Sequence, residues 1–190
     1  MNSVVTIIAE TFDSNPAVNW LIKQGRSRKH HIQNLAKYAF MKAWIRDGVY
    51  ISTNEKGVAL CYRFNKKRFS LVALWYQLKF ALTSIEVSRL PKVLKREAYR
   101  AQLRPASGAY YYFWFLSVLP EGRGAGFELK NAVFEQATKE HLPVYLETSV
   151  ERNQKIYEHI GFQPYHYWKD EKEGIQFWFL KWEPSQHKIQ

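Results

Sequence analysis

Cysteine is almost absent from this chain of 190 residues, which contains only Cys61. A single cysteine excludes an internal disulfide and a cysteine-rich zinc site, and it fits a reducing compartment. The histidines show no spacing that would present two imidazoles to one metal ion. We therefore expect a protein that uses no metal.

Long apolar runs are also missing. The longest, Ala109 to Leu119, is far shorter than the ~20 residues that a membrane-spanning helix needs. The stretch from Met1 to Glu10 has no basic residues ahead of its apolar ones, so it does not resemble a signal peptide. We expect a cytoplasmic protein with no membrane partner.

Acidic residues are scarce in the first half of the chain. Residues 1–104 hold 19 Lys and Arg against 6 Asp and Glu, a formal charge of +13, whereas residues 105–190 carry −2. A basic half attracts polyanions, such as nucleic acid, an anionic membrane or a phosphate-rich cofactor. The charge by itself does not choose among these partners.

The chain shows no internal repeat, low-complexity tract or linker that would divide it. Hydrophobic residues make up 46% and charged residues 24%, which is typical of a folded globular protein. A chain of this length is long enough for one substantial core. We expect a single domain over residues 1–190, with residues 64–108 as a helical insertion within it.

Hydrophobic periodicity predicts the elements along the chain. Helices are expected over Val4–Phe12, from about Ser27, over Phe69–Leu103 with a break at Pro91, over Ala125–Glu140 and over Arg152–Ile160. Strands are expected over Val49–Ser52, Val58–Tyr62, Tyr110–Val118, Val144–Thr148, Phe162–Trp168 and Ile175–Trp182. The order of the later elements predicts a mixed α/β sheet.

The most informative segment is the glycine-rich turn Gly122-Arg123-Gly124-Ala125-Gly126 between a strand and a helix. The first turn of a helix leaves N–H groups without partners, and these groups bind phosphate oxygens at the positive end of the helix dipole. Glycine allows an anion to approach the backbone closely. The segment fits neither a P-loop nor a Rossmann fingerprint. Taken alone, it would also fit a tight strand-to-helix connection.

A second segment lies downstream: Leu146-Glu147-Thr148-Ser149, then Asn153, Tyr157 and Gly161-Phe162. The two segments together resemble the GCN5-related N-acetyltransferase (GNAT) superfamily. Its phosphate signature is Arg or Gln, two residues, Gly, one residue, then Gly or Ala, after a strand and a proline. The stretch from Arg123 to Phe127 matches this pattern, and Glu128 departs from it because a small residue is expected there. The resemblance covers roughly Tyr110 to Trp168.

This resemblance implies a GNAT-type mixed, mostly antiparallel sheet flanked by helices, with the insertion between the third and fourth core strands. It implies an acetyl-CoA-dependent N-acetyltransferase that transfers the acetyl group directly to an amine. The acceptor partner would be a small molecule or a peptide, acetyl-CoA (coenzyme A) would be the co-substrate, and a homodimer stays open.

The resemblance also implies roles for single residues. Main-chain groups would hold coenzyme A: Leu116, Ser117 and Val118 along the pantetheine arm, and Arg123, Gly124, Ala125, Gly126, Phe127 and Glu128 at the diphosphate. The carboxylate of Glu128 would repel a diphosphate unless it turns away. Asn153 would form a hydrogen bond with the arm or with the backbone of the cofactor. Tyr157, one helical turn further on the same face, would protonate the leaving thiolate.

The general base is harder to assign. Family members often place a glutamate on the strand before the phosphate turn, but the strand Tyr110–Val118 has no carboxylate. Glu147, near the end of the next strand, is the remaining candidate, acting through water. The alternative is a structural glutamate bonded to nearby backbone, and no base is needed if the amine arrives neutral.

The insertion is strongly basic, and its cations include Arg96 and Arg100. They would favour an acidic acceptor or recruit the anionic cofactor, and a solvated helix face is the alternative. Two rival functions stay open. One is a non-catalytic protein on this fold that binds an acidic partner or, less in keeping with the motifs, nucleic acid. The other is an N-acyltransferase that uses a longer acyl-CoA.

Overall fold

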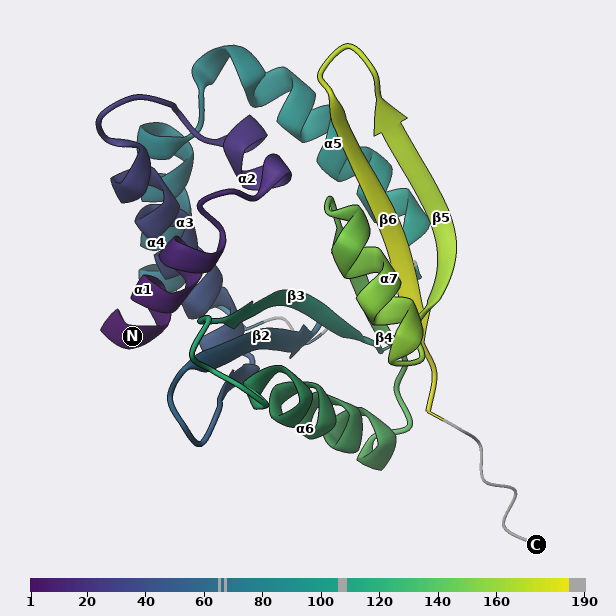
Figure 1. Cartoon of the computed structure of the whole chain (residues 1–190). Coiled ribbons are helices and arrows are strands. Elements are labelled where there is room, and N and C mark those ends of the chain that lie inside the picture. The colour runs from purple at the N-terminus through teal and green to yellow at the C-terminus, as the bar shows by residue number, and fades with distance from the viewer. Residues whose placement is uncertain (65, 67, 106–108, 185–190) are drawn as a thin grey trace, which may run out of the picture.

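The computed structural model describes residues 1–64, 66, 68–105 and 109–184, with helices arranged around one sheet (Figure 1). The helices are α1 (Asn2–Thr11), α2 (Pro16–Leu21), α3 (Arg28–Trp44), α4 (Leu71–Ser84), α5 (Leu90–Leu103), α6 (Ala125–Lys139) and α7 (Glu151–His159), with the 3-10 turn η1 (Val87–Arg89) before α5. The strands are β1 (Val49–Ile51), β2 (Gly57–Arg63), β3 (Tyr111–Val118), β4 (Val144–Thr148), β5 (Gln163–Asp170) and β6 (Ile175–Trp182). Among the helices described, none is long and apolar enough to span a bilayer.

The strands form one sheet in the order β1-β2-β3-β4-β6-β5. Of these neighbouring pairs, β3 and β4 run parallel and the others are antiparallel. The predicted mixed, mostly antiparallel sheet is therefore confirmed. Helices α1 and α3 pack on one face of β2 and β3, and α6 packs on the other face.

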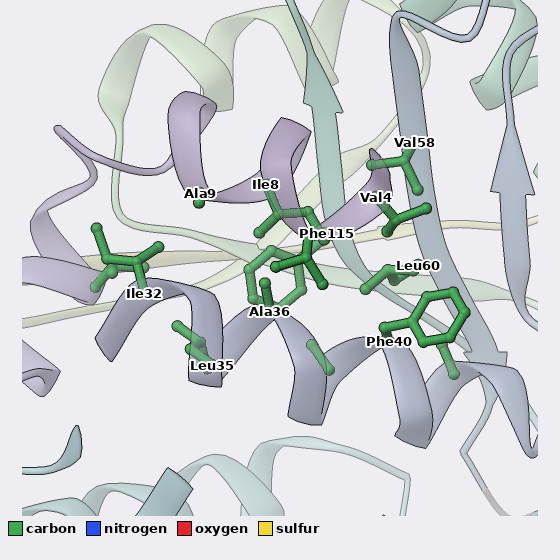
Figure 2. Packing of buried hydrophobic residues seen from close by; sticks show 14 of the residues in the cluster. Val4, Ile8, Ala9, Ile32, Leu35, Ala36, Phe40, Val58, Leu60 and Phe115 are labelled. Carbon is green, nitrogen blue, oxygen red and sulfur yellow. The ribbon is translucent and has the colours of Figure 1, made fainter. Parts of the chain in front are cut away.

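The first core lies between α1, α3 and the sheet (Figure 2). Val4 and Ile8 of α1 and Leu35 and Phe40 of α3 meet Leu60 of β2 there. The apolar face of α3 follows from the spacing in its sequence, because its buried apolar residues recur one, three and four positions apart: Ile32, Leu35, Ala36, Ala39, Phe40 and Ala43.

Strand β2 is buried on both faces. Val58, Leu60 and Tyr62 join the first core, whereas Ala59 and Cys61 enter a second core beneath α6. This alternation follows from the strand geometry, in which successive side chains point to opposite faces. The sheet is thus held between two apolar layers, and its middle strands are fixed in register.

The insertion consists of α4, η1 and α5 (Figure 1). It lies between the second and third strands of this sheet, so the predicted place between the third and fourth core strands is wrong. Residues 1–48, all of which are described, form helices and turns and add no strand before β1. Its predicted bounds include residues 65, 67 and 106–108, which lie outside the described residues.

The predicted helix break at Pro91 is wrong. The helix is interrupted between Ser84 and Leu90, and Pro91 lies in the first turn of α5. Proline is tolerated there because the first amides of a helix have no partner within it. Helix α2 was not expected from the sequence. It begins after Asn15, whose side chain accepts hydrogen bonds from the amides of Ala17 and Val18.

Candidate active site

Strands β3 and β4 lie side by side over only part of their length. Their pairing covers Tyr111–Phe113 on β3 and Val144–Leu146 on β4. At Trp114 the register between β3 and β2 shifts by one residue, which is the mark of a β-bulge and bends the strand. Beyond this point β3 and β4 separate. Among the described strands, none pairs with the edge of β3 that faces the gap.

A cavity of about 580 Å³ opens where the two strands separate. One part of its wall comes from Trp114–Leu116 of β3, Thr148 of β4, and Asn153 and Tyr157 of α7. The rest of the wall comes mainly from α2, α3, α4 and α5, so the insertion forms part of it. A cavity of this size accepts a small organic molecule.

The glycine-rich turn follows β3 and begins α6. Gly124 has a φ of 81°, a left-handed conformation that glycine adopts readily. The N–H groups of Arg123, Gly124 and Gly126 donate to no backbone oxygen of the described residues, so they lie free at the positive end of the helix dipole. A Cβ atom at Gly124 would meet no heavy atom within 4 Å. The turn is therefore open to an incoming anion.

No protein-family model and no curated protein matches the chain, but solved structures do. The histone acetyltransferase HPA2 and related acetyltransferase from Corynebacterium glutamicum is 18% identical, with a TM-score of 0.65 and coverage of 99% of this chain and 93% of that one. Arylalkylamine N-acetyltransferase 2 from Aedes aegypti is 16% identical, with a TM-score of 0.62 and coverage of 97% and 94%. A chain of the NatC complex bound to Gag peptide and CoA is 13% identical, with a TM-score of 0.50 and coverage of 97% and 93%.

The chain has the GNAT fold. Within it, the residues predicted along the pantetheine arm take different positions. Leu116 lines the cavity, and Ser117 is buried in the sheet. The side chain of Val118 lies against the turn, since Cβ atoms at Gly122 and Gly126 would fall 2.9 Å and 3.8 Å from its methyl groups. The strand thus connects the cavity to the turn without a break.

Some of the amides that were predicted to bind a diphosphate already donate hydrogen bonds to the protein backbone. Those of Ala125, Phe127 and Glu128 donate within the turn and the helix, to oxygens of Gly122 and Gly124 at 3.1 Å. Of this set, only the amides of Arg123, Gly124 and Gly126 remain free of backbone partners within the described residues. A Cβ atom at Gly122 would approach Lys56 and Val118 to 2.9 Å, so this glycine is required by packing.

Glu128 turns away from the phosphate turn. Its carboxylate accepts a hydrogen bond from the amide of Thr53 at 2.7 Å and one from the Thr53 hydroxyl at 3.2 Å. The side chain therefore ties the first turn of α6 to the loop between β1 and β2. This arrangement removes the repulsion that a free carboxylate would cause beside a diphosphate.

Asn153 and Tyr157 lie one helical turn apart on α7 and both line the cavity. The Tyr157 ring packs edge-on against Phe162, with ring centroids 5.7 Å apart. Burial raises the pKa of Tyr157 to about 12, so its hydroxyl keeps its proton at any physiological pH. The group can therefore donate a proton but does not act as a base.

Glu147 is held by two arginines of the insertion. One oxygen accepts a hydrogen bond from Arg104 at 2.6 Å, and the other pairs with Arg100. The Glu147 side chain is only 4% exposed. Protonation would leave two buried guanidinium groups without their counter-ion, which is costly. This geometry argues against the predicted base, and the partners are side chains rather than the backbone that the alternative supposed.

The inner face of α5 is not a solvated face. Arg96 is buried, and the side chains of Arg100 and Arg104 are nearly so, while Lys92 and Lys95 point to solvent. Both Arg100 and Arg104 also donate to the Tyr112 hydroxyl, at 2.9 and 3.2 Å. The insertion therefore turns part of its charge toward the cavity.

Lys42 is a cavity residue that the sequence reasoning missed. Its Nζ donates to the Tyr38 hydroxyl at 3.2 Å and lies 5.1 Å from the ring centre of Trp114. Burial, followed by the charge of Arg46, lowers the pKa of Lys42 to about 8. The four-residue spacing of Tyr38 and Lys42 on α3 was the one available signal, and it is common on helices.

The lowered pKa of Lys42 predicts a pH dependence of stability. Between pH 8 and 10.5 the unfolded chain holds a proton that the folded chain has lost, so stability should rise with pH across this window. Relative to Lys42→Met, the wild type should gain about 1–3 kcal/mol from pH 7 to about pH 9.5. Urea unfolding of both proteins measures this difference, and a constant difference would contradict the assignment.

Proposed function

We propose that the protein is an acetyl-CoA-dependent N-acetyltransferase that moves the acetyl group directly to an amine. The observation that carries this proposal is the meeting of three features around one end of β3. They are the unpaired edge beyond Trp114, the open phosphate-type turn that follows, and Tyr157 on the wall of the same cavity. Solved GNAT structures that bind CoA or are named for arylalkylamines support it.

Each part of the site would act on a different part of the co-substrate. Bound acetyl-CoA would supply an activated acetyl thioester. The free amides of the turn from Arg123 to Gly126 would hold its diphosphate. The edge of β3 from Leu116 to Val118 would orient the arm by strand-like hydrogen bonds, with Asn153 at its side. The Tyr157 hydroxyl would hold a proton ready for the departing sulfur.

The acceptor side needs a neutral amine. Glu147 is engaged by Arg100 and Arg104, and Glu97 is paired with Arg100, so the carboxylates of the cavity wall already have partners. We therefore propose that the amine loses its proton to solvent before it attacks. The cavity wall then has to position the nitrogen rather than deprotonate it.

A thiol-release assay tests the proposal. Acetyl-CoA is incubated with the protein and a panel of amines, and free thiol is measured over time. Acetyl-CoA at 100 times its Kd should also raise the melting temperature by about 5–10 °C. If neither thiol release nor a rise in melting temperature is seen, and the protein is retained on a DNA column only at low salt, the rival function of a non-catalytic nucleic-acid-binding protein would be favoured. Faster turnover with a longer acyl-CoA than with acetyl-CoA would show that the protein transfers a longer acyl group.

Replacement of Gly124 by valine should weaken acetyl-CoA binding about 10–100-fold, the worth of one or two hydrogen bonds to a charged group. A side chain there would fill the open approach to the free amides, and φ at +81° would resist it. Isothermal titration calorimetry measures the affinity.

Gly174→Val is the matched control. Gly174 also has a positive φ, of 62°, and open space around its Cβ position, but it lies in the loop between β5 and β6. It should lose comparable stability and keep its affinity for acetyl-CoA. Equal affinity losses in the two variants would show that strain, and not the turn, is responsible.

A further inference from the structure

The wall of the cavity carries more positive charge than negative. Its charged residues, within the described part of the chain, are the cations Lys42, Arg96, Arg100 and Arg104 and the carboxylates Glu97 and Glu147. The two carboxylates pair with Arg100 and Arg104. No salt bridge to a carboxylate is present for Lys42 or Arg96 among the described residues, so the cavity keeps two uncompensated cations.

Arg96 is the more unusual of these two. Only 8% of its surface is exposed, and its Nε and Nη1 atoms are buried without a hydrogen-bond partner among the residues described. Burial lowers the pKa of Arg96 to about 10, which reflects the cost of holding this charge away from water. Buried guanidinium groups are normally paired or hydrogen-bonded. The missing partner points to a ligand.

Two rings hold the Arg96 guanidinium in place. Its Cζ lies 4.0 Å from the ring centre of Trp20 and 5.2 Å from that of Phe177. Trp20 is itself fixed, because its Nε1 donates to Glu173 at 2.9 Å. Stacking engages the faces of the guanidinium and leaves the Nε and Nη1 groups at its edge without a partner among the described residues, and such an edge matches the two oxygens of a carboxylate. The group is therefore preorganised for an anion.

Arg96 also lies at a useful distance from the reaction site. It precedes Arg100 by one turn of α5, which separates the two Cβ atoms by roughly 6 Å. Arg100 contacts Glu147, close to the point where β3 and β4 separate. An acceptor whose nitrogen lies at the separated strands could thus place a second group near Arg96.

We propose that the acceptor is an amine that also carries a carboxylate, such as an amino acid, and that the Arg96 guanidinium binds this carboxylate. The inference rests on the proposed acetyl transfer but adds the substrate class. Arg96 is a specificity residue here, and Lys42 of α3 adds positive potential to the wall of the same cavity. Aromatic side chains around the cavity, among them Tyr38, Phe80 and Phe177, favour an aromatic amino acid over a small one.

Matched acceptor pairs test this proposal. L-phenylalanine and phenethylamine differ only in the carboxylate, as do L-tryptophan and tryptamine. The wild type should use the amino acids with a kcat/KM at least tenfold above that of the amines. In Arg96→Gln this selectivity ratio should fall about 10–100-fold, mainly through the KM of the amino acid. Arg89→Gln is the control.

The control is closely matched. The Arg89 guanidinium also stacks on Trp20, at 5.8 Å, but Arg89 does not line the cavity. Its replacement should leave the selectivity ratio at the wild-type value. A wild type that uses phenethylamine as well as phenylalanine, or an equal fall of the ratio in both variants, would overturn the carboxylate site.

A second measurement separates this site from catalysis. The probe 3-phenylpropionate has the carboxylate but no amine, and it should raise the melting temperature of the wild type and not that of Arg96→Gln. A rise in melting temperature with 3-phenylpropionate, without thiol release from any amine, would support the anion site and contradict the proposed acetyl transfer. Thiol release from phenethylamine without any shift would do the reverse.

Discussion

Replacement of Glu147 by glutamine should lower the free energy of unfolding by about 3–5 kcal/mol. The carboxylate is the shared partner of Arg100 and Arg104, and all three side chains are largely buried. Removal of one charge from such a group leaves the other charges in a poor solvent, which costs far more than a surface ion pair contributes. Urea unfolding followed by tryptophan fluorescence measures the change.

Glu135→Gln provides the reference for this variant. Glu135 pairs with Lys139 at 3.0 Å on the exposed surface of α6, where an ion pair of this kind contributes only ~0.3–0.5 kcal/mol. The two variants remove the same group from different surroundings. A Glu147→Gln protein with wild-type stability but almost no turnover would restore the base role predicted from the sequence and contradict the anchoring role described here.

Replacement of Tyr157 by phenylalanine should lower kcat about 100-fold, within the range of general acid catalysis. The affinity for acetyl-CoA should stay close to the wild-type value, because the hydroxyl is needed only as the sulfur departs. Thiol release under saturating substrate gives kcat, and calorimetry gives the affinity. A variant that keeps full turnover while chemistry limits the rate would rule out this proton donor.

Tyr167→Phe serves as the control for the loss of a hydroxyl. Tyr167 is exposed on β5, donates to Gln176 at 2.9 Å and does not line the cavity, so turnover should not change. The pH profile adds a second criterion. Because the pKa of Tyr157 is about 12, the wild type should show no alkaline loss of kcat from this group below about pH 10. Such a loss would require another proton donor.

The elements of the fold were largely predictable from the sequence because their signals are local. The apolar spacing on α3, the strand flanking Trp114 and the turn around Gly124 each depend on neighbours a few residues away. The spacing of Asn153 and Tyr157 likewise placed both on one face of a helix. These local patterns led to the GNAT fold and to one half of the candidate site.

The other half depends on contacts between distant parts of the chain. Glu147 meets Arg100 and Arg104, which precede it by 47 and 43 positions. Whether a glutamate is a base or a counter-ion is decided by what lies beside it, and periodicity carries no information about that. The same reasoning applies to Arg96, whose unmatched charge is visible only once Trp20 and Phe177 are seen around it.

The attachment of α5 has a consequence for motion. Arg100 and Arg104 form ion pairs with Glu147 on β4 and donate hydrogen bonds to the Tyr112 hydroxyl on β3. Both contacts lie close to the last residues at which these strands pair. The helix thus links β3 and β4 next to the point where the two strands separate. Any fluctuation that moves α5 away from the sheet must break the two buried ion pairs of Glu147. We therefore expect α5 and the separated ends of β3 and β4 to open together as one cooperative unit.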